Sequence, residues 1–152
     1  MVLSTRLEED RVNIAGYEFP DDLYYDKNHS WARVEGNQVT QGFTDFAQKL
    51  AKEIAYVEIP RPGRDLQQGQ AVMSVESGKW VGRVFAIVSG KLAQANEELE
   101  FSPTLINESA YDQGWLIKID AAARDELKNL WRANDPALAE LIQSEMAKYN
   151  IT

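Results

Sequence analysis

The chain has 152 residues, 44% hydrophobic and 26% charged, which suits one soluble domain with a single core. Sixteen basic and twenty-four acidic residues give a net charge of −8, which repels phosphate backbones and anionic lipids and argues against nucleic acid and membrane as partners. Cysteine is absent, which excludes disulfides, thiolate metal sites and cysteine nucleophiles, so any thiol chemistry must arrive on a cofactor.

We expect residues 1–22 to form a lead-in segment that is partly ordered through Tyr17 and Phe19 and ends in a turn at residues 20–22. The N-terminus lacks a charged-then-apolar signal pattern, and no stretch approaches the roughly 18 apolar residues of a membrane span. The sequence therefore predicts a cytoplasmic protein whose main domain spans residues 23–152.

From residue 23 to 119, short runs rich in Val, Ile, Tyr, Phe and Trp alternate with Gly, Pro and Asn, as is typical of strands joined by tight turns. The pair Gly36-Asn37 favours a hairpin turn. One short helix is predicted over 44–52, with Thr44 or Asp45 as its N-cap. The predicted strands are 31–34, 38–42, 54–59, 71–77, 81–88, 90–95 and 114–119.

After residue 119 the apolar residues take on helical spacing. Asp120 is positioned to cap a first helix that includes Trp131, and Asp135-Pro136 opens a second. We expect both helices to pack on the sheets as a cover for the core.

The segment at 75–82 places a lysine, Lys79, beside a glycine between two predicted strands, at the tip of a hairpin. A lysine at a turn is most often an exposed charge, but the surrounding motifs give it a second interpretation. With these motifs the chain resembles the glycine cleavage H-protein family, a relative of the lipoyl domains of 2-oxoacid dehydrogenases. The resemblance covers about two thirds of the chain and lies in NHSWARVEG (28–36), GFTDFAQKL (42–50), YVEIPRPG (56–63), VESGK (75–79), VSG (88–90) and INESAYDQGWLIKI (106–119).

The resemblance implies that lipoate is joined covalently to Lys79 by a lipoate ligase or lipoyl transferase. In the family a glutamate three residues before the lysine and glycines eleven after and sixteen before it frame the lipoylation hairpin, and here these are Glu76, Gly90 and Gly63. The implied fold is mainly β: a barrel-sandwich hybrid, that is, a flattened β-sandwich, with a short inserted helix and two C-terminal helices. The implied role is a non-catalytic carrier with a swinging arm.

Two nearby features leave alternatives open. A biotinyl carrier has the same hairpin but typically flanks its lysine with methionines, whereas Gly78 and Trp80 flank this one, so lipoate is favoured. His29 and Trp31 match the family's His-x-Trp near where the arm docks, although a histidine beside a tryptophan is more often simply packed. This is the single histidine, and we predict neither a metal site nor a catalytic triad.

The chain departs from typical H proteins at four places. Ser30 stands where they have a glutamate that can pair with the cationic amine of the loaded arm, and residues 80–82 read Trp-Val-Gly where they have small residues. Residues 50–54 read Leu-Ala-Lys-Glu-Ile where they have LGD-I. The fourth departure is the lead-in segment. These features resemble the H-protein-like lipoate-binding proteins of the heterodisulfide-reductase-like sulfur-oxidation system.

Three hypotheses follow. The first is a lipoyl carrier that relays sulfur and electrons from a heterodisulfide-reductase-like complex and is reoxidised by dihydrolipoamide dehydrogenase. The second is an H protein that carries the aminomethyl group between glycine cleavage enzymes. The third is an unlipoylated interaction module in which Lys79 is an ordinary surface charge.

Overall fold

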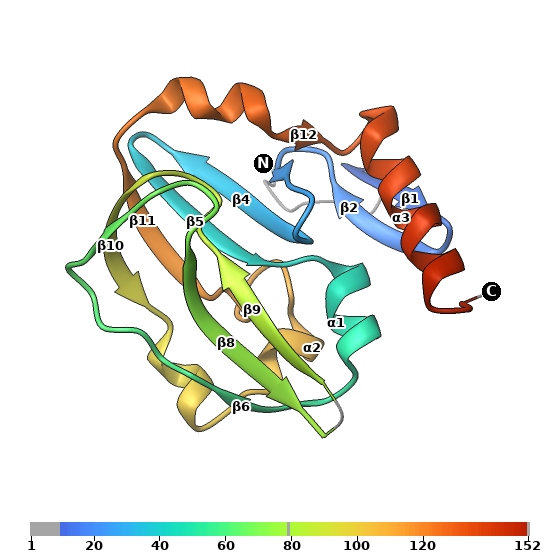
Figure 1. Ribbon diagram of the computed structural model, residues 1–152, viewed down its shortest axis with the longest axis horizontal. Coiled ribbons are helices and arrows are strands. Elements are labelled where there is room, and N and C mark those ends of the chain that lie inside the picture. The colour runs from blue at the N-terminus through green and yellow to red at the C-terminus, as the bar shows by residue number, and fades with distance from the viewer. Residues whose placement is uncertain (1–9, 79, 152) are drawn as a thin grey trace, which may run out of the picture.

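The computed structural model (Figure 1) describes residues 10–78 and 80–151. Within these residues the strands form three sheets: an N-terminal hairpin of two strands, a large sheet of seven and a small sheet of three.

The N-terminal hairpin is β1 (Arg11–Ile14) and β2 (Tyr17–Pro20). The large sheet runs in the order β12 (Trp131–Arg132), β3 (Tyr24–Tyr25), β4 (Ser30–Glu35), β5 (Gln38–Phe43), β11 (Ile117–Ala121), β10 (Gly90–Ala95) and β7 (Asp65–Leu66). The small sheet is β6 (Ile54–Val57), β8 (Ala71–Ser77) and β9 (Val81–Phe85).

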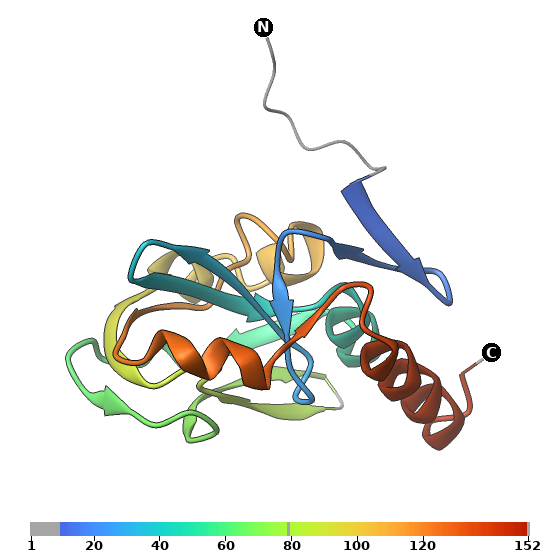
Figure 2. The same cartoon turned by 90° about the horizontal axis from the view of Figure 1, so that it is seen from above.

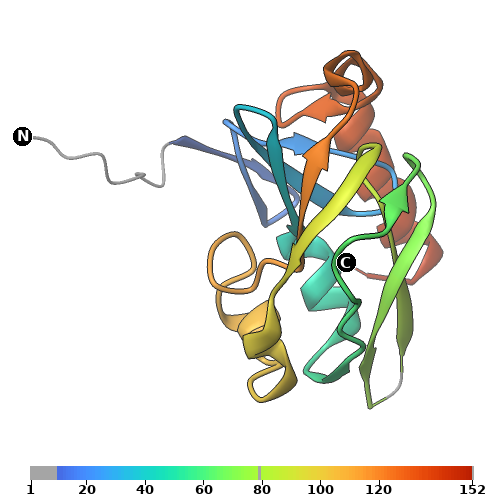
Figure 3. The same ribbon diagram turned by 90° about the vertical axis from the view of Figure 1, so that its left-hand side faces the viewer.

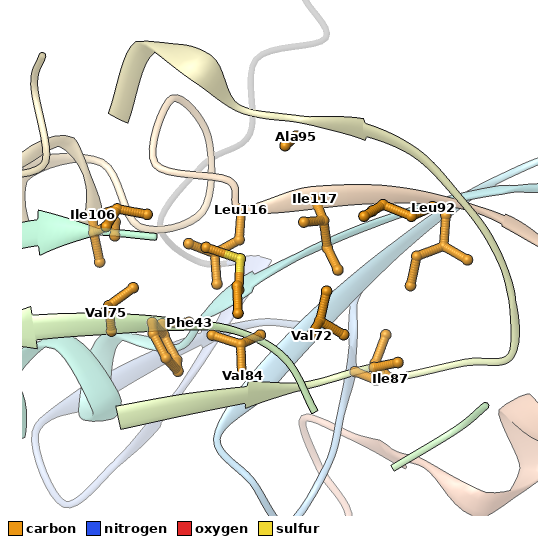
Figure 4. Packing of buried hydrophobic residues seen from close by; sticks show 14 of the residues in the cluster. Phe43, Val72, Val75, Val84, Ile87, Leu92, Ala95, Ile106, Leu116 and Ile117 are labelled. Carbon is orange, nitrogen blue, oxygen red and sulfur yellow. The ribbon is translucent and has the colours of Figure 1, made fainter. Parts of the chain in front are cut away.

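The main core lies between the large and small sheets, which Figure 3 shows as separate layers, with β8 and β9 in green apart from β10 and β11 in yellow and orange. Leu92 and Ile117 from the large sheet face Val75 and Val84 from the small one (Figure 4). All four side chains are at most 1% exposed, and burial of each is worth about 1.5–3 kcal/mol. The predicted mainly β barrel-sandwich fold is confirmed.

The strands predicted at 71–77 and 90–95 have the observed bounds, and those at 31–34 and 38–42 are slightly longer than predicted. The strands predicted at 54–59 and 81–88 end early, and the one predicted at 114–119 begins late and runs to residue 121. β9 ends at Phe85, because the next residues leave the sheet and Ile87 N donates to the side chain of Gln41, 3.0 Å away. β11 begins at Ile117, because a turn closed by a hydrogen bond from Gly114 N to Ser109 O (2.7 Å) precedes it. In both places hydrogen bonds outside the sheets, one long-range and one local, replace strand pairing at one end of the predicted strand.

The predicted inserted helix is α1 (Asp45–Ala51), which follows β5. Thr44 is its N-cap, and the Thr44 side chain accepts a hydrogen bond from Ala47 N at 3.2 Å. This satisfies one of the free N–H groups of the first turn. A second short helix, α2 (Leu105–Glu108), lies close to α1.

The C-terminal region contains two helical segments, but the first differs from the prediction. It is a short 3₁₀ helix, η3 (Arg124–Asn129), and Asp120 does not cap it, because Asp120 pairs with Lys91 and Gln38 inside β11. Trp131 lies in strand β12 and pairs with Tyr25. Pairing with neighbouring strands has therefore overridden the local helical pattern.

The second C-terminal helix is α3 (Pro136–Lys148), and the prediction that it begins at Asp135-Pro136 is confirmed. The Asp135 side chain accepts from Ala137 N at 3.0 Å. No helix within residues 10–78 and 80–151 is long and apolar enough to cross a membrane. A further 3₁₀ helix, η2 (Glu97–Glu100), follows β10.

The N-terminal hairpin lies at the same end of the molecule as α1 and α3 (Figure 2) and shares a second, aromatic-rich core with them. Phe19 is fully buried in this core, and the ring of Tyr17 packs edge-on against the α1 helix. The backbone of Glu18 anchors the hairpin: its N–H donates to Asp45 Oδ2 (3.1 Å) and its carbonyl accepts from the Tyr111 hydroxyl (2.6 Å). The described part of the lead-in segment, residues 10–22, thus packs on the rest of the protein through both aromatic residues named from the sequence.

Candidate functional site

The predicted attachment residue, Lys79, lies outside the described residues, so its surroundings are described from its neighbours. β8 and β9 run antiparallel and pair up to Glu76 and Val81. Beyond that pair, Ser77 N donates a hydrogen bond to Trp80 O at 2.8 Å. Position 79 therefore belongs to the short connection that joins β8 to β9 at one end of the small sheet.

Glu76, predicted as part of the lipoylation hairpin, lies in β8 close to this connection. It pairs with Tyr56 of β6 on one side and with Val81 of β9 on the other. Its side chain is partly exposed and has no hydrogen-bond or ion-pair partner among the residues that the structure describes. A carboxylate is thus available to an incoming molecule three residues before position 79.

The two predicted hairpin glycines lie together, but on the large sheet. Gly63 has a φ of +107° and donates its N–H to Leu92 O at 2.7 Å. Gly90 pairs with Leu66, and a Cβ at residue 90 would lie 2.1 Å from Asp120 O. Both positions thus have a structural need for glycine, whether or not an enzyme recognises them.

The side chain of Trp80 faces the interior of the protein. The sequence alone did not decide whether this side chain packs on its own hairpin or faces a partner. Its indole packs against Phe43, with ring centroids 6.3 Å apart, and lies over Gly82. A Cβ at residue 82 would lie 1.9 Å from the indole. The absence of a side chain at residue 82 therefore makes room for the large one at residue 80.

A hollow of about 670 Å³ lies beside the connection between β8 and β9. The Ser77 hydroxyl is buried there and has no hydrogen-bond partner among the described residues. The hollow is lined by Lys52, Glu53, Ile54, Ala55, Ser77 and Gly78. Ile54 and Ala55 supply the apolar part of this lining, and Lys52 and Glu53 supply its charged part.

Asn107, from α2, holds the wall of this hollow in place. Its side-chain oxygen accepts from Ile54 N at 2.9 Å, and its amide nitrogen donates to Lys52 O at 2.8 Å and to Gln48 Oε1 at 3.1 Å. These bonds join the end of α1 to the start of β6. The sequence indicated no role for Asn107, because its partners lie more than fifty residues away.

Ser30, which replaces the family's glutamate, is buried between the sheets at 1% exposure. Its hydroxyl accepts from Gln41 Nε2 at 3.2 Å. The same amide donates to Phe85 O (2.7 Å), and Gln41 Oε1 accepts from Ile87 N. Position 30 thus takes part in a buried polar link between the large sheet and the end of β9.

The side chain of His29 makes one ring-packing contact and one hydrogen bond, both to residues of the second core or α3. Its ring lies 5.1 Å from that of Phe46, and Nε2 lies 2.9 Å from Glu145 Oε1 on α3. Across residues 10–78 and 80–151, no group of three or more His, Asp or Glu side chains is arranged to hold a metal ion.

Asp26 is the acidic group that the fold perturbs most clearly. Burial raises its pKa from 3.8 to about 6, although hydrogen bonds from Asn28 N and Ser30 N to its carboxylate oppose the shift. It borders a hollow of about 330 Å³ together with Ile87 and Trp131. This hollow adjoins the residues that follow β9, at the end of the strand away from position 79.

Comparison with known proteins identifies the family. The sequence profile described as "Glycine cleavage H-protein" matches residues 23–144. The chain belongs to the glycine cleavage H-protein family. It is 42% identical over 114 residues to a glycine cleavage system H protein from Staphylococcus saprophyticus, covering 75% of this chain and 90% of that one. It is 43% identical over 117 residues to one from Brevibacillus brevis, covering 77% and 93%.

A solved structure supports the same assignment. The crystal structure of a glycine cleavage system H protein from Mycobacterium marinum matches with a TM-score of 0.70 and 25% identity, over 80% of this chain and 98% of that one. H proteins are lipoyl carriers without a catalytic site, so this member of the family is a carrier and not an enzyme. The family match begins at residue 23, after the N-terminal hairpin.

Proposed function

We propose that this chain is a lipoyl carrier of glycine cleavage, with lipoate joined through an amide bond to Lys79. The observation that carries the proposal is the family match over residues 23–144, combined with a β8–β9 hairpin whose connection contains position 79. Residues 23–152 would be the carrier domain. The named relatives are glycine cleavage proteins, which favours this pathway over the sulfur-oxidation pathway expected first.

The chain's contribution is to hold and present the arm. When bound, lipoate would supply the reversible thiol chemistry that a chain without cysteine lacks. Trp80 stiffens the base of the arm by packing into the core, and Asn107 fixes the wall beside Gly78.

The test has two steps. Mass spectrometry of the native protein should find one lipoyl group, mapped to Lys79, and a Lys79→Arg variant should have none. The lipoylated chain should then support glycine–bicarbonate exchange by glycine decarboxylase. A native chain with bare Lys79 would overturn the proposal and support the unlipoylated interaction module.

A second candidate is the relay of sulfur and electrons in heterodisulfide-reductase-like sulfur oxidation. Two observations favour it: Ser30 is buried and uncharged, so it offers no carboxylate to a cationic amine, and the N-terminal hairpin lies outside the family match. Full lipoylation with no exchange activity, together with binding to heterodisulfide-reductase-like subunits, would support it. In either pathway we expect a lipoate ligase or lipoyl transferase and dihydrolipoamide dehydrogenase as further partners.

A further inference from the structure

Lys52, the residue that follows α1, has a backbone conformation that only glycine adopts easily. Its φ is +69° and its ψ is −159°. A side chain in this region of φ and ψ is crowded by the neighbouring backbone, so a residue other than glycine is strained there. A glycine at residue 52 would have no such strain. The fold alone therefore favours glycine over lysine at this position.

Hydrogen bonds on both sides hold residue 52 in this conformation. Lys52 N donates to Gln48 O at 3.1 Å, where α1 ends. Lys52 O accepts from Asn107 Nδ2 at 2.8 Å, and the side-chain oxygen of Asn107 accepts from Ile54 N at 2.9 Å. Backbone strain that the surrounding structure fixes in this way is concentrated at binding and catalytic sites. The strain at Lys52 is thus a reason to look for a role of its side chain.

The side chain of Lys52 lies beside the connection that contains position 79. The end of α1 and the tip of β8 and β9 are at the same end of the molecule (Figure 1). Lys52 lines the hollow of about 670 Å³ there, together with Ser77 and Gly78. Its ammonium is exposed and has no hydrogen-bond or ion-pair partner among the described residues. A free cation therefore borders the hollow next to the attachment position.

We propose that Lys52 pairs with a thiolate of the lipoyl arm once the arm has been reduced. This inference rests on the proposed function, because a chain without cysteine carries thiols only on the attached cofactor. A neighbouring ammonium favours the thiolate over the neutral thiol, whose proton goes to solvent. The thiolate is the form that attacks a disulfide, so Lys52 would help the emptied arm to be reoxidised. The same ammonium would repel an arm that carries a cationic amine.

The other charges near this hollow give the proposal a sign. Glu53 lines the hollow with Lys52, and its carboxylate would repel a thiolate. Lys49 of α1 and Glu108 of α2 line an adjoining hollow. Lys49 is already paired with Asp45, at 3.2 Å. We therefore expect removal of the charge at residue 52 to disfavour the thiolate and removal of the charge at residue 53 to favour it.

The test is the fraction of ionised thiol on the fully lipoylated protein, reduced with a phosphine and followed against pH by the ultraviolet absorbance of the thiolate. Lys52→Ala keeps the strained backbone and removes the charge, and Lys52→Arg keeps both. Where the wild type is partly ionised, Lys52→Ala should contain about two- to threefold less thiolate, and Lys52→Arg should match the wild type. Salt at about 1 M should remove the difference. Glu53→Gln should contain more thiolate than the wild type.

Lys52→Gly separates the strain from the charge. It should lose thiolate to the same extent as Lys52→Ala. The unlipoylated Lys52→Gly protein should nevertheless melt about 2–6 °C above unlipoylated Lys52→Ala, because glycine relieves the strain. Lys91→Ala is the matched control, since Lys91 is an exposed residue of β10 in the large sheet. It should change neither the thiolate fraction nor the melting temperature.

The outcomes separate this inference from the proposed function. A wild-type chain that accepts no lipoyl group at Lys79 would overturn both. Equal thiolate fractions in lipoylated wild type and Lys52→Ala would overturn the pairing alone, and so would an equal loss in Lys91→Ala. A Lys52→Gly protein that is no more stable than Lys52→Ala would overturn the strain from which the inference starts.

Discussion

The two faces of the small sheet differ in burial at the end of β9 that is next to position 79. On the inner face, Trp80 fills the end of the core over Gly82. On the outer face, Val81 is 65% exposed beside Glu76. Two adjacent residues thus differ in their surroundings: the side chain of Trp80 packs against the core, whereas that of Val81 is exposed to solvent. Substitutions on the inner face should therefore change the free energy of unfolding more than substitutions on the outer face.

The largest expected effect comes from the buried link between the sheets. Gln41→Leu would leave Phe85 O and Ile87 N without their partner, and each buried unsatisfied group costs about 1–3 kcal/mol. We expect the free energy of unfolding in urea to fall by about 2–4 kcal/mol. Gln94→Leu, at an exposed position of β10, is the control and should change it little. Equal midpoints for the two variants would contradict this role of Gln41.

The inner face at the tip can be tested by a double-mutant cycle. Gly82→Ala places a Cβ against the indole of Trp80 and should destabilise the protein by about 1–3 kcal/mol. In a Trp80→Ala background the same change should cost little, because the clash is gone. Gly78→Ala is the control, since a Cβ there meets nothing within 4 Å. An equal cost in both backgrounds would show that Gly82 is needed for another reason.

A smaller effect is expected beyond the other end of β9, at Asp26. Its pKa is raised to about 6 by burial, so the folded state binds more protons than the unfolded state between about pH 4 and 6. The contribution of protonated Asp26 to the free energy of unfolding is therefore complete below about pH 4 and is lost as the pH rises through about 6. Asp26→Asn keeps an acceptor for Ser30 N and should flatten this dependence, with a gain of about 1–2 kcal/mol at pH 7.

Urea unfolding of the wild type and Asp26→Asn from pH 4 to 8 measures this effect. Glu140→Gln, at an exposed position of α3, is the control and should leave the slope as it is in the wild type. A pH profile that is the same in all three proteins would show that Asp26 is not the group responsible.

The smallest expected change in stability is on the outer face. Tyr56→Thr and Val81→Thr should each shift the free energy of unfolding by no more than about 0.5 kcal/mol, because their side chains face solvent. A loss of stability above about 1 kcal/mol would mean that the outer face also supports the fold.

Local signals were enough to predict much of the fold. The strands at 71–77 and 90–95 and the capped helices α1 and α3 follow from alternation, turn residues and N-caps that act within a few residues. The prediction was wrong at Asp120, because its place in β11 depends on pairing with strands distant in the sequence. Local patterns carry no information about such partners.

The candidate site was predictable only in part. The motifs around 75–82 pointed to Lys79 and Glu76, and their roles stay proposals. Whether Trp80 faces inward depends on the register of β9 against β8, which a single sequence does not specify. The contacts of Asn107 and Gln41 join segments far apart in the chain, so only the folded structure brings them together.

The way the N-terminal hairpin is anchored affects how it can change over evolutionary time. Asp45 and Tyr111 hold it through the main chain of Glu18, and main-chain atoms are the same for almost every amino acid. Glu18 can therefore be replaced without loss of these two hydrogen bonds, whereas Asp45 and Tyr111 cannot. Relatives that carry such a hairpin should be easier to recognise from a paired aspartate and tyrosine in the shared domain than from the hairpin's own sequence.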